Sequence, residues 1–428
     1  MKRTIDKQYD VVVVGGGVAG AVAAIQAGRA GANTLLIEKN AGCGGTTTSS
    51  GVSFPGLFHY RGHQIIRGIG WEWVEDCVEL MGTKLPDFSK QLVDPTHWHF
   101  QIQLNPALFM AICDEKLVSA NVDTCYHTML GAACNQENRW NLTICGREGL
   151  RAVSASVLID ATGDATASEM AGAVVSRSKV LQPGTMVYHL RGYSWEDIDP
   201  KQLSAAIESA VTKGELYYDD IGWNHTGISF NMWQNYGGNS NHILVRNPQT
   251  SAGRSDLEQR ARFAMLRFLR FSHKQPGLEN LEIDSISSEC GVRESGVVEG
   301  DITITAEDYT QCRIWPDSMA FSYYPVDLHS FSTKGVQPKP FTQSHAPTIP
   351  LGALLPKNTK NLIVAGRIIS SDRLANSGLR VQASCMAMGQ VAGMAAAMAV
   401  KKNCGIRELE SSEIRTNLKK FDAICPKI

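Results

Sequence analysis

The stretch Val11-Val-Val-Val-Gly-Gly-Gly-Val-Ala-Gly20 decides the fold, because a strand, a glycine turn and a helix start follow one another along it. Residues 9–14 are mostly β-branched, which predicts a buried strand. The glycines form the pattern Gly15-x-Gly17-x-x-Gly20. In this pattern the first glycine permits a tight turn, the second lets the backbone approach a pyrophosphate, and the third lets helix and strand pack closely. Residues 18–30 predict the helix, whose amino end offers free N–H groups to phosphates.

A second predicted strand, over residues 34–37, ends at Glu38 and completes a β-α-β unit. A carboxylate at this place would accept hydrogen bonds from two ribose hydroxyls, and it would repel a 2′-phosphate. The glycine pattern alone is weak evidence, since the same turn occurs in α/β proteins that bind no nucleotide. The strand, the pattern, the helix, the second strand and the terminal acid together predict a dinucleotide site that is not built for NADP.

The composition of the 428 residues argues against several classes of protein. With 41 basic and 42 acidic residues the net charge is −1, which offers no electrostatic case for binding nucleic acid or an anionic membrane surface. The eleven cysteines are odd in number and contain no Cys-x-x-Cys pair, so neither a disulfide framework nor a zinc ribbon is expected. Scattered free thiols favour a reducing cytoplasm.

One uncharged stretch, residues 383–400, has the composition of a membrane helix and contains Gly389-x-x-x-Gly393, a spacing typical of membrane helix dimers. Gln390 interrupts it, and the stretch is short for a membrane span. We therefore expect a buried helix of a soluble protein and no membrane span.

The remaining pattern predicts two domains, the first of which is discontinuous in sequence. The expected elements of the first domain are helices over residues 62–82, from residue 106 and over residues 380–400, a third core strand at 122–126, a meander of strands over 129–158 and a strand at 361–366. Residues 176–345 lack glycine-rich phosphate signals and carry most of the aromatic residues. The expected fold is α/β: a Rossmann-type domain with a parallel sheet and a β-meander, residues 1–175 and 346–428, plus an α+β substrate domain, residues 176–345.

Three features favour FAD over NAD as the dinucleotide. About 80 residues separate the second and third core strands, and a meander follows, a layout that resembles the glutathione-reductase-type FAD domain. Residues 160–165, Asp-Ala-Thr-Gly-Asp-Ala, resemble the flavoprotein Gly-Asp motif, whose acid, here Asp164, holds a ribityl hydroxyl; the alternative role of Asp164 is a helix N-cap. Residues 377–381 open a helix of small residues, and in flavoproteins such a helix points its amino end at the flavin.

These motifs resemble the bacterial FAD-dependent oxidoreductase family, which is distantly related to the fumarate reductase and succinate dehydrogenase flavoproteins. The matching blocks are residues 11–20, 44–46, 56–58, 160–165, 291–295 with Gly300, and 361–393. The resemblance implies a non-covalently bound FAD. The residues expected to contact it are Gly15, Gly17, Ala19, Gly20, Glu38, Lys39, Gly44, Gly45, Thr46, Cys125, Ala161, Gly163, Asp164, Gly366, Arg367, Gly378, Leu379, Arg380 and Val381.

Candidate catalytic residues are those that suit proton transfer or charge stabilisation. His59 and His63 follow the glycine-rich loop, and their spacing fits proton transfer, two metal ligands on a helix, or plain packing; no further metal motif accompanies them, so no metal is expected. Arg293 suits an anionic group on the substrate, unless it pairs with its neighbour Glu294. His329 either lines the substrate cleft or belongs to a solvated turn, and Arg380 lies where the last helix should approach the flavin.

We expect an FAD-dependent oxidoreductase that transfers a hydride between flavin N5 and a small organic substrate. No second Gly-x-Gly-x-x-Gly is present, so an external electron donor or acceptor must renew the flavin. The alternatives are a flavin monooxygenase and a non-catalytic electron-transfer subunit. The near-zero charge argues against a flavoprotein that modifies RNA. The sequence names neither the substrate nor the oligomeric state.

Overall fold

The computed structural model describes residues 7–94, 96–222, 228–329, 341 and 343–428. Its central sheet has a parallel part whose apolar residues are largely buried, because helices pack against one face and the β-meander packs against the other. The parallel strands are, in spatial order, β5 (Asp123–Cys125), β2 (Thr34–Ile37), β1 (Gln8–Val14), β8 (Gly149–Asp160) and β16 (Leu362–Val364).

The long strand β8 joins the parallel sheet to an antiparallel meander. Its first half pairs with β7 (Arg139–Gly146), which pairs with β6 (Met129–Gln136), and its second half runs parallel to β1. The turn between β6 and β7 places Glu137 and Asn138 at positive φ, which matches the polar turn expected there. The predicted parallel sheet with a β-meander is confirmed.

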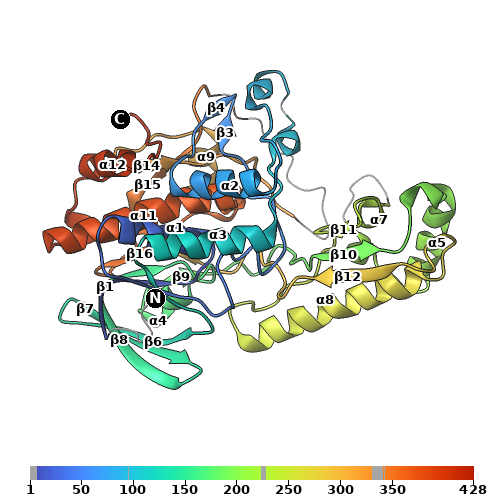
Figure 1. Cartoon of the computed structure of the whole chain (residues 1–428), viewed down its shortest axis with the longest axis horizontal. Helices are drawn as coiled ribbons and strands as arrows, with labels where there is room; N and C mark the ends of the chain where they lie inside the picture. The colour runs from blue at the N-terminus through green and yellow to red at the C-terminus, as the bar shows by residue number, and fades with distance from the viewer. Residues whose placement is uncertain (1–6, 95, 223–227, 330–340, 342) are drawn as a thin grey trace.

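Four helices cover this sheet: α1 (Val18–Arg29), α2 (Ile69–Leu80), α3 (Pro106–Ser119) and α11 (Gln382–Lys402), as Figure 1 shows. Helix α11 packs against α1 at very short range, because Cβ atoms added to Gly389 and Gly393 would lie 2.1 and 2.2 Å from the carbonyl oxygens of Ala19 and Ala23. Among the described residues α11 is the helix long and apolar enough to cross a membrane, and 89% of its apolar window is buried in the protein. The Gly-x-x-x-Gly spacing here brings two core helices together.

Two predicted helix starts are wrong. The helix expected over residues 62–82 begins at Ile69, because residues 59–64 form the hairpin of β3 (His59–Tyr60) and β4 (His63–Gln64). The helix expected from Arg380 begins at Gln382. A separate short helix, α10 (Arg373–Leu379), precedes it, since the Asp372 carboxylate accepts a hydrogen bond from the amide of Ala375 and caps an earlier start.

The second domain extends from the first along the longest axis of the molecule (Figure 1). Its three-stranded sheet has the order β11 (Gly237–Gly238), β10 (Tyr188–Arg191), β12 (Glu282–Ile286), and the long helix α8 (Ser251–Ser272) packs beside it. Trp233 and Phe268 pack against each other, with ring centroids 5.1 Å apart, in a hydrophobic core that belongs to this domain. The helices α5 (Pro200–Thr212), α6 (Tyr218–Ile221) and α7 (Asn231–Gln234) surround that core.

The segment after residue 297 returns to the first domain. Ile304, Tyr309 and Met319 lie in the same hydrophobic core as α1 and α11, although the predicted limits assign them to the substrate domain. The remaining elements are α4 (Thr166–Met170), β9 (Val175–Ser176), β13 (Val297–Val298), α9 (Ala306–Thr310), β14 (Ser318–Phe321), β15 (Thr348–Pro350) and α12 (Ser411–Lys419). These segments contain no glycine pattern from which the return of the chain to the first domain could be predicted.

Candidate cofactor and substrate site

The glycine turn has the close contacts that its pattern predicts. Gly15 has φ +99°, and a Cβ on it would lie 2.5 Å from the carbonyl oxygen of Ala161. A Cβ on Gly20 would lie 1.8 Å from the carbonyl oxygen of Gly15, so the third glycine permits the close approach of helix and turn. Gly17 has open space where its Cβ would be, and it caps α1 without a side-chain hydrogen bond. This open cradle at a helix amino end fits a phosphate-bearing group.

Glu38 lies directly against this cradle. Its carboxylate accepts hydrogen bonds from the amide of Gly16, at 2.5 Å, and from the amide of Asn40, at 2.7 Å. Burial raises the pKa of Glu38, and the two amides oppose that rise. The Glu38 amide donates to the carbonyl of Cys125, which places Cys125 at the same sheet edge. The neighbouring Lys39 pairs with Glu289 of the second domain, and no sequence motif predicts this partner.

The loop after the second strand folds over the glycine turn. Gly44 and Gly45 both have positive φ, and the Gly44 amide donates to the carbonyl of Gly16 at 2.9 Å. Thr46 lines a cavity, described below. Two other predicted contacts, Ala19 and Gly366, lie against each other, because a Cβ on Gly366 would lie 3.3 Å from the Cβ of Ala19; Gly389 also packs against Ala19.

Asp164 is held by two arginines from different domains. Arg367 lies 3.0 Å and Arg254, on α8, 2.7 Å from its carboxylate oxygens. Burial by itself would raise the pKa of Asp164, but the two guanidinium groups hold it below its usual value. Arg367 also donates to the carbonyl of Gly163. The N-cap of α4 is Ala165, so the alternative role of Asp164 as a cap is not realised.

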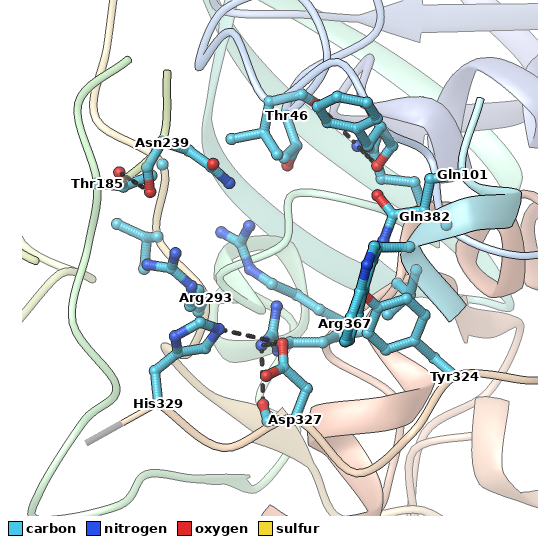
Figure 2. Close-up of a pocket in the computed structure, with 18 of the residues that line it drawn as sticks. Thr46, Gln101, Thr185, Asn239, Arg293, Tyr324, Asp327, His329, Arg367 and Gln382 are labelled. Atoms are coloured by element: carbon cyan, nitrogen blue, oxygen red, sulfur yellow. Dashed lines mark hydrogen bonds and ion pairs between the residues drawn. The ribbon is translucent and has the colours of Figure 1, made fainter. Parts of the chain in front are cut away.

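A cavity of about 570 Å³ lies between the first domain and the strands and loops of the second (Figure 2). It brings together residues that are far apart in the sequence. The predicted site residues that line it are Thr46, Arg293, His329, Arg367, Arg380 and Val381. Three of the five predicted catalytic residues therefore line the same cavity, together with Asp327 and His242, which were not among the predicted catalytic residues.

Arg293 presents a cation to this cavity. Its guanidinium donates to the carbonyl of Pro183 at 2.7 Å, and among the described residues it forms no ion pair with a carboxylate. Glu294 pairs instead with Arg373, at 2.8 Å, so the alternative Arg293–Glu294 pair does not form. Burial, and after it the charge of Arg380, lowers the pKa of Arg293 to about 10. The guanidinium therefore stays charged at neutral pH.

A chain of polar side chains crosses the cavity wall. The ring nitrogens of His242 and His329 lie 3.3 Å apart, and His329 lies 3.1 Å from the Asp327 carboxylate, which is 3.5 Å from Arg380 (Figure 2). Burial lowers the pKa of His329, and burial with the nearby cations lowers that of His242 to about 3. Burial alone would raise the pKa of Asp327, but the His329 hydrogen bond and the arginines hold it well below its usual range.

The structure corrects the expectation that residues 377–381 open the last helix. Gly378 and Leu379 end α10, and the Arg380 amide donates to the carbonyl of Asn376 at 2.9 Å, so it is not a free donor for a ligand. The amino end of α11 still borders the cavity, because its N-cap Val381 and its first residue Gln382 both line it. The side chain of Arg380, not its amide, faces this space.

His59 and His63 do not line the cavity. Arg61 and Gly62 adopt positive φ and turn the chain into a hairpin, so the two rings lie on opposite strands and not on one helix face. His59 is buried and stacks on Phe88, with ring centroids 3.7 Å apart, and burial lowers its pKa to about 4. Among the described residues no group of three or more His, Cys, Asp or Glu side chains is arranged to hold a metal ion.

The glycine cradle, its acid and the adjoining cavity define a dinucleotide-dependent redox enzyme of the Rossmann type. The chain belongs to the FAD dependent oxidoreductase family, whose family model matches residues 10–418. It is thus an FAD-dependent enzyme, as the residue pattern predicts.

Comparisons with individual proteins are more distant, and no curated protein matches the chain. A geranylgeranyl bacteriochlorophyll reductase-like protein from Thermoplasma acidophilum aligns at 14% identity and a TM-score of 0.45, over 97% of this chain and 83% of that one. The anhydrotetracycline hydroxylase OxyS from Streptomyces rimosus aligns at 10% identity and a TM-score of 0.46, over 96% of this chain and 65% of that one. The p-nitrophenol 4-monooxygenase PnpA from Pseudomonas putida DLL-E4 gives 13% identity, a TM-score of 0.40 and coverages of 96% and 84%.

Proposed function

We propose that this enzyme transfers a hydride between FAD and a small organic substrate whose anionic or polar end is bound by Arg293. The observation that carries the proposal is a guanidinium that faces the large cavity without a carboxylate partner among the described residues. A cation kept in a desolvated cleft stabilises negative charge on a reacting molecule more strongly than water does. When bound, FAD supplies a ring that accepts or donates a hydride at N5.

The residues proposed to hold FAD follow the motifs. The turn from Gly15 to Gly20 would receive the pyrophosphate, Glu38 the adenosine ribose, and Asp164 with Arg367 the ribityl chain. The loop at Thr46 would approach the flavin, since it lies in the cavity wall. The cellular location that we propose is the cytoplasm, in keeping with the absence of any disulfide among the eleven cysteines, all of which lie in the described residues.

The polar chain gives the protein a means to orient and move a proton. Asp327 remains ionised, accepts a hydrogen bond from His329 and so fixes the orientation of that imidazole. His329 in turn contacts His242 across the cavity wall. Arg380 contacts Asp327 and the side-chain oxygen of Gln182, lines the cavity, and would bind a second polar group of the substrate.

The proposal predicts that Arg293→Gln slows turnover while the FAD site stays intact. Small hydroxy, amino and unsaturated carboxylic acids are offered anaerobically to the oxidised and to the dithionite-reduced enzyme, and the flavin absorbance is followed. We expect one member to change the flavin, and Arg293→Gln to lower that rate about 100-fold, as for the loss of a charge-stabilising donor. The exposed Arg191→Gln, which breaks a surface pair with Glu282, is the control. Equal rates in wild type and Arg293→Gln, with FAD fully bound, contradict the assignment.

The same reaction distinguishes the alternatives. A flavin monooxygenase consumes oxygen in step with hydroxylated product, whereas a dehydrogenase that uses an external acceptor does not. An electron-transfer subunit needs room for the flavin alone, whereas Arg293 and the Asp327–His329 pair in the cavity wall favour catalysis on a bound molecule. An external donor or acceptor is part of this proposal.

A further inference from the structure

A second, smaller cavity lies behind Arg293 and has a different character from the first. It measures about 200 Å³ and shares Arg293 and Arg367 with the large cavity. We call it the arginine chamber, after the four arginines that line it together with Ser295: Arg177, Arg293, Arg367 and Arg373. The glycine cradle and Glu38 do not line the arginine chamber.

The arginines of the chamber outnumber the carboxylates that they contact. Arg177 pairs with Glu169 and Arg373 with Glu294, at 2.8 Å in each case. Asp164, however, is shared by Arg367 and Arg254, and Arg293 pairs with no carboxylate among the described residues. A surplus of positive charge inside a protein is costly unless an anion compensates it.

Two polar groups of the chamber also lack partners. The hydroxyl of Ser295, a residue that is only 4% exposed, has no hydrogen-bond partner among the described residues, and the same holds for the buried Nε of Arg177. Buried donors left unpaired cost free energy, so each calls for an acceptor that the protein itself does not supply.

The backbone leaves room for the Arg177 side chain. A Cβ on Gly296 would lie 2.8 Å from a methyl carbon of Val175 and 3.6 Å from both Cγ and Nε of Arg177. A side chain at residue 296 would therefore displace Val175 of β9, whereas Arg177 would lie at an ordinary contact distance.

We propose that the arginine chamber is an oxyanion site that takes a phosphate or carboxylate group. The guanidinium groups supply planar, charged donors that match such oxygens, and Ser295 supplies a neutral donor at the same wall. Because Arg293 lines both cavities, the bound anion lies beside the cation that faces the substrate and offsets part of its charge. This site does not depend on the proposed reaction, and its test needs no substrate.

The test is calorimetric titration of the FAD-loaded protein with inorganic phosphate, in a phosphate-free buffer at constant ionic strength. We expect one saturable site per chain, and about 10-fold weaker binding in Ser295→Ala and in Arg177→Gln, as for the loss of a hydrogen bond to a charged group. Arg191→Gln on the surface is the control and should bind phosphate like the wild type. Equal affinity in the wild type and both variants overturns the proposal.

Acetate in a parallel titration separates the two forms of the ligand. Saturable binding of either anion supports the site, and the anion that binds more tightly identifies the group that the site takes. If neither anion gives saturable heat, the proposal is overturned. Ser295→Ala removes a single oxygen atom and guards against the case in which Arg177→Gln fails to fold. Crystals soaked in selenate provide the second measurement: an anomalous peak between Ser295 and Arg177 is expected, and a chamber without one contradicts the proposal.

Discussion

Arg293 and Glu294 are neighbours in the sequence, yet the structure gives them unrelated partners. Glu294 pairs with Arg373 beside the smaller cavity, whereas Arg293 donates to the Pro183 carbonyl, pairs with no carboxylate among the described residues, and lines both cavities. An arginine that pairs with its own neighbour attracts an anionic ligand less strongly, because the neighbour's carboxylate already offsets its charge. Whether Arg293 can bind a ligand therefore depends on which partner the carboxylate of Glu294 takes.

His59 predicts how the stability of the protein depends on pH. Its pKa is about 4 in the folded protein, against 6.5 for an unperturbed histidine. Between these values only the unfolded chain binds the proton, so the stabilising effect is complete above pH 6.5 and is lost as the pH falls towards 4. His59→Phe keeps a ring against Phe88 and removes the titration. From pH 7 to pH 5, its free energy of unfolding should fall about 2 kcal/mol less than that of the wild type in chemical denaturation.

His63→Gln is the matched control, because His63 lies exposed on the neighbouring strand of the same hairpin. It should lose as much stability in acid as the wild type does. Identical pH dependence of His59→Phe and wild type would show that the folded state does not disfavour the charged ring.

At the scale of elements, the packing of α11 on α1 decides the meaning of the Gly389-x-x-x-Gly393 spacing. The two helices approach until a Cβ on Gly389 would lie 2.1 Å from the carbonyl oxygen of Ala19. Ala19 lies within the pattern Gly15-x-Gly17-x-x-Gly20, in the first turn of α1, so this contact also fixes the helix whose amino end forms the phosphate cradle. Helix packing and the cofactor site are therefore joined through one short contact.

Gly389→Ala should separate these helices. The added methyl group meets backbone, which cannot rotate away, so we expect a loss of about 2 kcal/mol in the free energy of unfolding after the better helix propensity of alanine is counted. Gly131→Ala, in strand β6, is the control, since its nearest neighbour, the Thr143 carbonyl oxygen, would lie at 3.4 Å. Thermal and denaturant unfolding measure both. A Gly389→Ala protein as stable as Gly131→Ala would contradict the close packing.

At the scale of the whole molecule, the second domain contacts both ends of the proposed FAD site. Glu289 pairs with Lys39 beside Glu38, and Arg254, on α8, pairs with Asp164 near the strand ends of the first domain. The pairs join residues 250 and 90 positions apart. The position of the second domain and the binding of the cofactor are thus linked through side chains.

Arg254→Gln tests this link. Asp164 keeps its pair with Arg367, so the local charge remains balanced, but the ion pair from α8 is lost. We expect about 10-fold weaker FAD binding and a lower unfolding temperature, as for the loss of one partly buried charged hydrogen bond. Arg260→Gln is the control on the same helix, because the carboxylate with which Arg260 pairs in the described part of the chain, Asp256, also lies on α8. If fluorescence titration gives the two variants equal FAD affinity, the second domain does not support the cofactor site through Arg254.

The sequence by itself determined the parts that local physics decides. The β-branched run before Gly15, the three glycines and the acid after the second strand predicted the β-α-β unit and its dinucleotide, because each feature acts through residues close to it in the chain. The meander followed from alternating patterns and polar turns. The family of the chain followed from the same motifs.

Only the tertiary structure decided which distant charges meet. His242 and His329 are 87 positions apart and Asp164 and Arg254 are 90 apart, and neither pair has a local pattern that announces it. His59 and His63 show the converse, since a regular spacing suggested one helix face and a two-residue turn at Arg61 and Gly62 put them on opposite strands. Side-chain partners of this kind depend on how two domains pack against each other, and the free energy of that packing is spread over the whole core.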